Sequence, residues 1–189
     1  MSSFYYFAYG SNLLNARLQN RCASAKPVAI ASVSGHAINY GMVADDDHGA
    51  SGKMAMFRTE NGNDQVHGVV YEMAISEAPV LDKFEGLDWD RPMKYTREPN
   101  LLVETPTGEK LQTVTYMVEP HPNPPHPYHW YWALCLSGAI ENGLPLHHQE
   151  MLAQHPYMPD PHEVREGKLE AEMLLNKSGF GHLIEKTGA

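Results

Sequence analysis

One carboxylate, Glu85, has the sequence surroundings of a candidate general base. Val80, Leu81 and Phe84 give a predicted short helix an apolar face, and Gly86 is typical of the residue that ends a helix. Glu85 follows Leu81 by four positions, so it shares that face and lies at the negative end of the helix dipole. Burial and the dipole would both raise the pKa of Glu85, which suits a base. The alternative is a frayed last turn with Glu85 in water.

A second candidate lies at the N-terminal end, where an aromatic run over residues 4–9 stops at Gly10. Such a run predicts a buried strand. Ser11 and Asn12 are good helix N-caps, and a helical pattern begins at Leu13. Glycine lets a backbone approach a ligand closely, and the first amides of a helix lack internal partners, so the turn could bind a carboxylate or an oxyanion. The alternative is a capped turn without a ligand. Ser11 is not in a Gly-x-Ser-x-Gly motif, and no histidine is tied to it by sequence.

Metal chemistry has weak support in the sequence. Asp45, Asp46 and Asp47 form an acidic triplet, but they lack the spaced ligands and the closing glutamate of a calcium loop, so a solvated loop is predicted. The chain has 11 histidines. None of them forms the His-x-x-x-His pair with a glutamate that is typical of a zinc helix. The sequence therefore predicts no metal site.

Composition narrows the class of protein. The chain has 189 residues, of which 42% are hydrophobic and 20% charged, which predicts one globular domain with a real core. The formal charge of −9 argues against nucleic acid or an anionic membrane as the main partner. Cys22 and Cys135 are far apart and indicate no disulfide framework. With no signal-peptide pattern and no bilayer-spanning apolar run, we expect a cytoplasmic protein without a membrane segment.

Strands and helices that would position the two candidates follow from the hydrophobic pattern. The expected strands cover residues 4–9, 28–33, 37–43, 54–58, 66–73, 93–103 and 111–118. The expected helices begin at residue 13 and cover 76–85, 128–142, 146–154 and 163–175, and a proline-rich surface loop covers 120–127. Asp82 and Lys83 are expected on the solvent side of their helix. No internal repeat or linker divides the chain.

Three motifs resemble one known family. Tyr9-Gly10-Ser11-Asn12-Leu13, with Asp82-x-x-Glu85-Gly86 downstream, is similar to the γ-glutamylcyclotransferase family of the AIG2-like superfamily. Glu141-Asn142-Gly143-Leu144-Pro145-Leu146, then Gln149-Glu150, resembles a segment of the animal-type enzymes. The resemblance runs in order from about Phe4 to about Pro156, so we expect a γ-glutamylcyclotransferase-like domain over 1–156. Residues 157–189 would form a partly helical tail on or beyond that domain. The loop from Asp45 to Lys53 departs from the family's glycine-rich pattern.

The resemblance implies an α+β fold, with a small, mixed, partly closed β-barrel and helices packed around it. It implies a small-molecule γ-glutamyl substrate, no metal or organic cofactor, and homodimers among some relatives. It also implies a reaction that makes 5-oxoproline and releases a free amine-bearing product. In that reaction the substrate's own α-amine attacks its γ-carbonyl, so the enzyme must supply a base and hold the chain folded back.

Roles for individual residues also follow from the resemblance. Glu85 would take the proton of the α-amine and hand it to the leaving nitrogen. Tyr128 would be a substrate-contacting tyrosine, and Tyr95 either a pocket residue or a core strand tyrosine. The substrate-binding segment would be Tyr6, Phe7, Ala8, Tyr9, Gly10, Ser11, Asn12 and Leu13.

Three hypotheses about function stay open at this point. The first is a cyclotransferase acting on γ-glutamyl amino acids or dipeptides. The second is the same chemistry on another substrate, such as glutathione, a γ-glutamyl amine or a biosynthetic intermediate. The third is a binding module without turnover, although a pure binder has no need for a buried carboxylate. Specificity for the leaving group is expected in the loops 45–53 and 120–127, because loops often carry binding residues.

Overall fold

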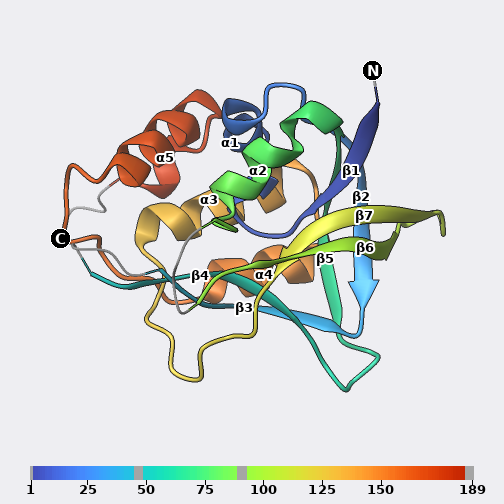
Figure 1. Ribbon diagram of the computed structural model, residues 1–189. Coiled ribbons are helices and arrows are strands. Elements are labelled where there is room, and N and C mark those ends of the chain that lie inside the picture. Colours follow the sequence, from blue (N-terminus) through green and yellow to red (C-terminus); the bar gives the residue numbers. More distant parts are fainter. Residues whose placement is uncertain (1, 45–48, 89–92, 186–189) are drawn as a thin grey trace.

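The computed structural model describes residues 2–44, 49–88 and 93–185. Five strands form a closed barrel in the order β1-β5-β2-β6-β7, and helices pack around it (Figure 1). The strands are β1 (Ser3–Ala8), β2 (Lys26–Ser34), β5 (Gln65–Ala74), β6 (Thr96–Glu104) and β7 (Lys110–Met117). The expected α+β barrel is therefore confirmed.

Two of the strand pairings that close the barrel are much shorter than the others. β1 pairs with β5 along its whole length, but its parallel pairing with β7 is recorded only between Tyr6 and Val114. β2 meets β6 at the single pair Ser32 and Glu104. The barrel thus closes through one residue pair at each of these two places, whereas the β2–β5 and β6–β7 ladders are long.

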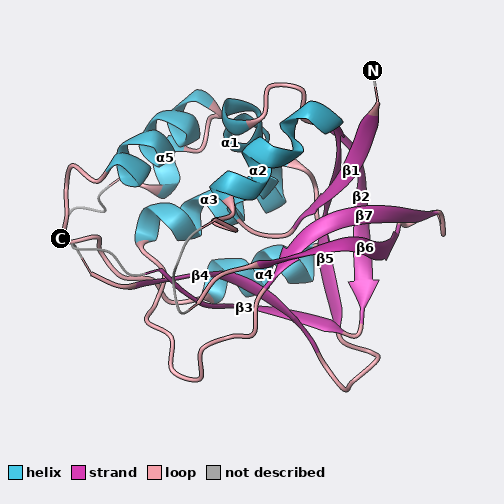
Figure 2. Ribbon diagram, in the orientation of Figure 1, coloured by secondary structure: helices cyan, strands magenta, loops and turns pink. Residues whose placement is uncertain are grey.

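The remaining two strands form a separate ribbon. β3 (His36–Ala44) and β4 (Ser51–Arg58) pair with each other and lie below the barrel in Figure 2. Gly35, with φ of +69°, separates β2 from β3, in keeping with the break expected there. A Cβ on Gly52 would lie 2.5 Å from the carbonyl oxygens of Tyr40 and Pro125, so only glycine lets β4 approach its neighbours this closely. The ribbon places β4 beside the turn at residue 10.

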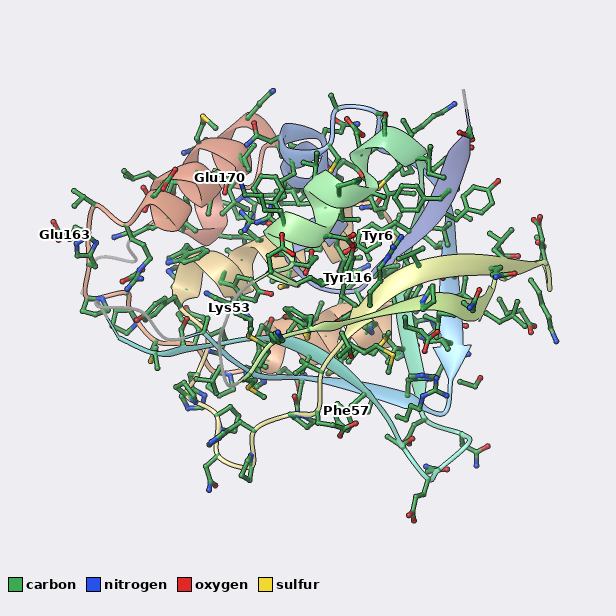
Figure 3. The ribbon with its side chains drawn as sticks, viewed as in Figure 1. Tyr6, Lys53, Phe57, Tyr116, Glu163 and Glu170 are labelled. Carbon is green, nitrogen blue, oxygen red and sulfur yellow. The ribbon has the colours of Figure 1, made fainter. Side chains whose placement is uncertain are left out.

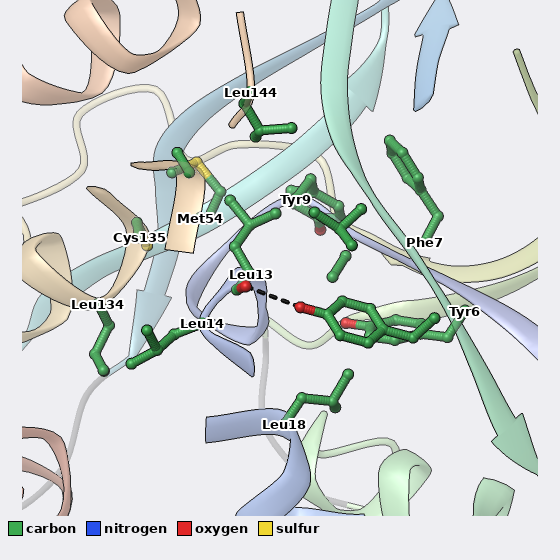
Figure 4. Close-up of a cluster of buried hydrophobic side chains, with 14 of the residues drawn as sticks. Tyr6, Phe7, Tyr9, Leu13, Leu14, Leu18, Met54, Leu134, Cys135 and Leu144 are labelled. Carbon is green, nitrogen blue, oxygen red and sulfur yellow. Dashed lines mark hydrogen bonds between the residues drawn. The ribbon is translucent and has the colours of Figure 1, made fainter. Parts of the chain in front are cut away.

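The helical layer is organised around one almost fully buried helix, α3 (His129–Glu141). A Cβ on Gly138 would lie 2.3 Å from the backbone nitrogen of Leu14, so α3 packs directly on the N-terminal turn. Figure 4 shows Leu13 and Leu14 in the same apolar cluster as Leu134 and Cys135 of α3. The other helices are α1 (Asn15–Arg21), α2 (Ala78–Phe84), α4 (Leu146–Gln154), α5 (Glu166–Lys177) and the short 3-10 turns η1 (Ser11–Leu13), η2 (Ile75–Glu77) and η3 (Gly181–Leu183).

The N-terminal turn differs from the expectation in one respect. The α-helix begins at Asn15, after the 3-10 turn η1, and neither Ser11 nor Asn12 caps a helix through its side chain. The carboxylate of Glu141 instead accepts the backbone N–H of Asn15 at 2.9 Å. The expected caps were wrong because the Asn12 amide is used in tertiary hydrogen bonds.

Helix α2 also differs from the expectation, in which of its side chains are buried. Gly86 has φ of +72°, which confirms the expected helix end. Only Leu81 is fully buried, whereas the side chains of Val80 and Phe84 are 40% and 46% exposed, so the expected three-residue apolar face was wrong. Asp82 is not simply solvated either, because it accepts a hydrogen bond from the Tyr116 hydroxyl at 2.6 Å.

The last long helix, α5, packs against α1 and α3. An ion pair of 3.1 Å joins Arg17 of α1 to Glu170 of α5, and Figure 3 shows Glu170 on this helix. The 120–127 segment forms an irregular loop, as expected. In the described ranges, no helix has the length and apolar character needed to cross a bilayer.

Candidate active site

The N-terminal turn and Glu85 lie together, although they are far apart in the sequence. Both line one small pocket, which we call the Glu85 pocket. Its walls come from β1, the turn after it, β4, the residue after α2, the residue before β6, β7 and α3. The lining residues are Tyr6, Tyr9, Gly10, Ser11, Asn12, Met54, Glu85, Tyr95, Tyr116 and Tyr131.

Glu85 follows the last residue of α2 and is held by a short hydrogen-bonded chain. Asn12 Nδ2 donates to Glu85 Oε1 at 2.8 Å and lies 3.1 Å from the Tyr6 hydroxyl. Arg21 Nη1 donates to Asn12 Oδ1 at 3.0 Å. This chain fixes the Asn12 amide with its nitrogen toward the carboxylate. Asn12 thus orients Glu85.

The electrostatic environment of Glu85 is the one expected of a base. Burial raises the pKa of Glu85 above its ordinary value. The Arg21 guanidinium, the Asn12 hydrogen bond and Arg17 act in the opposite direction, and Asp82 adds to the rise. The net shift of the Glu85 pKa is upward, so the carboxylate holds a proton more readily than a solvated glutamate, as suits a general base.

A wall of tyrosines surrounds this carboxylate. Burial, then the charge of Glu85, raise the pKa of the Tyr6 and Tyr9 phenols, so both remain neutral. The Tyr6 and Tyr116 rings pack edge to face at 6.0 Å, and both residues are labelled in Figure 3. The Tyr9 hydroxyl donates to the Tyr116 carbonyl. The phenols therefore present fixed, neutral groups to the pocket.

Strand β4 forms the opposite wall through the backbone of Met54. Its N–H donates to the Tyr131 hydroxyl at 3.1 Å, and its carbonyl accepts the Tyr95 hydroxyl at 2.6 Å. A Cβ on Gly10 would lie 3.0 Å from Met54 Cβ and 3.6 Å from the Tyr131 hydroxyl. The glycine thus permits a close approach, but in this structure the nearest atoms belong to β4.

Seven of the eleven residues predicted for the site line the Glu85 pocket: Tyr6, Tyr9, Gly10, Ser11, Asn12, Glu85 and Tyr95. Phe7, Ala8 and Leu13 are fully buried and lie outside its lining. The Leu13 carbonyl accepts hydrogen bonds of 2.8 Å from the Tyr71 hydroxyl and from Asn142 Nδ2. These three residues therefore build the core beneath the pocket.

Tyr128 is the fourth residue that lies outside the pocket lining. It precedes the first turn of α3, is 2% exposed, and has the guanidinium of Arg165 5.0 Å from its ring centroid. Tyr131, three residues later, lines the pocket instead. Tyr128 has an extended backbone and precedes the helix, whereas Tyr131 lies in the first turn of α3, and residue type alone does not distinguish the two tyrosines.

Met54 and Tyr116 were also missed by sequence analysis. Tyr116 lies on β7, where an inward-facing tyrosine looks like any other core residue in sequence. Met54 contributes through its backbone, which leaves no signal in its residue type. Their participation depends on how β4 and β7 dock against the turn.

The Glu141–Leu146 motif contacts the turn but is not part of the lining of the Glu85 pocket. Glu141 binds the first amide of α1, and Asn142 binds the Leu13 carbonyl. The motif that resembles the animal-type enzymes thus holds the turn in place. The acidic triplet at 45–47 lies outside the described residues, and in the described part of the chain no group of three or more His, Cys, Asp or Glu could hold a metal ion.

Comparison with known proteins gives a consistent result. The family model described as Gamma-glutamyl cyclotransferase, AIG2-like matches residues 6–134. A gamma-glutamylcyclotransferase of Bos taurus is 33% identical over 156 residues, covering 79% of this chain and 77% of its own. That of Mus musculus is 30% identical over 175 residues, covering 90% and 86%. A solved gamma-glutamyl cyclotransferase structure superposes with a TM-score of 0.77 at 30% identity, covering 93% of this chain and 99% of that one.

Proposed function

This chain belongs to the AIG2-like gamma-glutamyl cyclotransferase family and accordingly has gamma-glutamyl cyclotransferase activity. From this premise we propose that it acts on γ-glutamyl amino acids and that Glu85 is its general base and acid. The observation that carries the assignment is a half-buried carboxylate with a raised pKa, oriented by Asn12 and facing a turn of backbone and phenols. A buried carboxylate with a raised pKa is suited to accepting a proton and returning it.

The reaction needs one proton acceptor and no external nucleophile. Glu85 removes a proton from the substrate's α-ammonium, and the free amine nitrogen forms a bond to the γ-carbonyl carbon. The carbonyl oxygen becomes an oxyanion in a tetrahedral intermediate. When the intermediate collapses, the bond from this carbon to the amide nitrogen breaks, and the protonated Glu85 returns its proton to that nitrogen. The ring nitrogen still carries two protons at this point. It loses one of them to the Glu85 carboxylate, which passes it to the released amine and so returns to its starting state. The products are 5-oxoproline and a free amino acid.

The residues of the pocket support these reaction steps by positioning the substrate. We assign the turn at Gly10 and Ser11 to the glutamyl part of the substrate or to the oxyanion, because its backbone lines the same small pocket as Glu85. Tyr95 and Tyr131 form the opposite wall and would keep the substrate folded back for ring closure. Asn12 would hold Glu85 in line with the α-amine.

Release of 5-oxoproline from a substrate panel tests the substrate class. We expect release from γ-glutamyl-L-alanine, and none from glutathione or from lysine carrying the γ-glutamyl group on its ε-amine. Release from either of the latter two alone would keep the chemistry but contradict the substrate assignment. No release from any of the three would contradict the proposed function, and binding of 5-oxoproline would then test for a pocket without turnover.

The remaining parts of the proposal concern the whole protein. We propose a cytoplasmic location, and a homodimer like those the family resemblance implies. We also propose that residues 1–156 form the catalytic unit and that the tail packs on it through α5, which contacts α1 and α3. Light scattering after gel filtration measures the assembly state, and a monomer at micromolar concentration would contradict the dimer.

A further inference from the structure

A second ionisable group lies beside the Glu85 pocket, on strand β4. Lys53 is next to the pocket residue Met54, and Figure 3 labels it on the ribbon. Its Nζ lies 4.4 Å from the ring centroids of Trp130 and Tyr131 and 5.6 Å from that of Tyr128. We call Lys53 and these three rings the Lys53 cluster. Tyr131 belongs to both regions, so one aromatic ring separates the ammonium from the pocket.

The described part of the chain places no paired anion in the Lys53 cluster. Among the residues that the structure describes, no carboxylate forms an ion pair with Lys53 and no acceptor takes a hydrogen bond from it. The carboxylate of Asp160 is already engaged, because it accepts Arg165 Nε at 2.7 Å and Trp130 Nε1 at 2.9 Å. Aromatic faces stabilise a cation but do not neutralise its charge. A half-buried ammonium without a counter-ion favours an anionic ligand.

The chemistry of the substrate supplies such an anion at a suitable place. In a γ-glutamyl amino acid the leaving nitrogen is bonded to a carbon that carries a carboxylate. That nitrogen must lie near Glu85, so its carboxylate lies just outside the pocket. None of the described residues that line the pocket is a lysine or an arginine. The cation for this carboxylate must therefore lie beside the pocket, as Lys53 does.

Building on the proposed function, we propose that Lys53 binds the carboxylate of the leaving amino acid and makes the enzyme selective for γ-glutamyl amino acids over γ-glutamyl amines and amides. The Tyr131 ring lies between the reacting centre and this subsite. Tyr128, which does not line the Glu85 pocket, belongs to the wall of the subsite. Lys53 is thus a specificity residue and takes no part in the proton transfers.

The test compares two substrates that differ only in this carboxylate, γ-glutamyl-L-alanine and γ-glutamyl-L-alaninamide. In Lys53→Met we expect KM for the acid to rise about tenfold, as for a lost charge-assisted hydrogen bond, while kcat and the KM for the amide stay unchanged. Lys53→Arg should retain most of the preference. The matched control is Lys83→Met, which removes the same charge from an exposed position on α2.

Two results would overturn the proposal. An equal rise in KM for both substrates would mean that Lys53 acts on the glutamyl part or on packing, and no change would mean that it binds no carboxylate. Calorimetric binding of both compounds to Glu85→Gln, with and without Lys53→Met, separates this proposal from the proposed function. Absence of turnover in the wild type would count against the proposed function alone, and loss of acid binding in the double variant would still support Lys53.

Discussion

The Glu85 pocket and the Lys53 cluster treat a half-buried charge in opposite ways. Glu85 has its partners within the protein, through the hydrogen bond from Asn12 and the nearby charge of Arg21. Lys53 lies over the faces of aromatic rings, and no ion pair joins it to a carboxylate of the described residues. A group that must exchange protons is held in a fixed geometry before substrate arrives. A group that only has to recognise an anion can leave its strongest interaction to the ligand.

The largest effect on activity should come from replacing Glu85, the charged group of the first region. In Glu85→Gln we expect kcat to fall by ~10²–10⁴-fold, the usual contribution of a general base, with substrate still bound. Stopped assays of 5-oxoproline release and calorimetry measure the two quantities. Glu77→Gln, also on the α2 side of the protein and outside the pocket lining, is the control. Full activity in Glu85→Gln would refute the catalytic assignment.

Removing the group that orients Glu85 should have a smaller effect. In Asn12→Ala we expect kcat to fall about tenfold, because a hydrogen bond to a charged group is lost. That hydrogen bond lowers the pKa of Glu85, so its loss should move the acid limb of the kcat/KM profile to higher pH. Asn20→Ala, an exposed position on α1, should change neither quantity. An unshifted acid limb would show that Asn12 does not set the protonation of Glu85.

Tyr131 belongs to both the Glu85 pocket and the Lys53 cluster, so a variant at this position can distinguish their contributions. Tyr131→Phe keeps the ring beneath Lys53 but removes the hydroxyl that accepts the Met54 N–H. We expect a loss of ~1–3 kcal/mol in the free energy of unfolding, from the unpaired amide, and a few-fold lower kcat. The preference for γ-glutamyl-L-alanine over its amide should persist. If that preference disappears, the hydroxyl rather than Lys53 recognises the carboxylate.

The smallest expected effect is on stability, because burying the Lys53 ammonium lowers the free energy of unfolding. Burial, then the charges of Arg17 and Arg165, lower the pKa of Lys53 from 10.5 to about 7, while Cys135 and Asp160 act in the opposite direction. The unfolded chain therefore binds more protons than the folded one between pH 7 and 10.5, and stability rises with pH over this range.

It follows that Lys53→Met should stabilise the protein, fully below pH 7 and progressively less toward pH 10.5. We expect Tm at pH 6 to rise by ~2–4 °C, the shift that ~1 kcal/mol produces in a protein of this size. Thermal unfolding at pH 6 and pH 10 measures the difference, with Lys83→Met as the control. A gain of equal size at both pH values would mean that packing rather than charge is responsible.

How far the sequence predicts each region depends on how many segments build it. Much of the Glu85 pocket could be predicted because Gly10 and Asn12 lie in the turn between β1 and α1 and Glu85 directly follows α2, where residue type is informative. Lys53 could not, since its environment comes from the first turn of α3 and from residues near Asp160, brought together only by packing. The same limit explains why Tyr128 was assigned to the pocket in place of Tyr131.

The fold shows the same division. Residues 28–33 and 37–43 were correctly expected as strands, with a break at Gly35. Their partners could not be predicted, because β2 joins the barrel through β5 and β6 whereas β3 pairs with β4 alone. Alternation of apolar residues indicates a strand but does not specify its neighbour.

The position of β1 in the barrel has a consequence for synthesis of the chain. β1 pairs with β5 and with β7, so its hydrogen bonds are complete only after residues near 70 and 114 have been synthesised. The contacts of the turn after β1 are complete later still, because α3 and the Glu141–Asn142 pair that anchor the turn are synthesised after β7. Contacts this distant in sequence form slowly. Nascent chains that end before residue 142 should therefore lack the pocket altogether, and the unpaired aromatic strand β1 would be a binding site for chaperones.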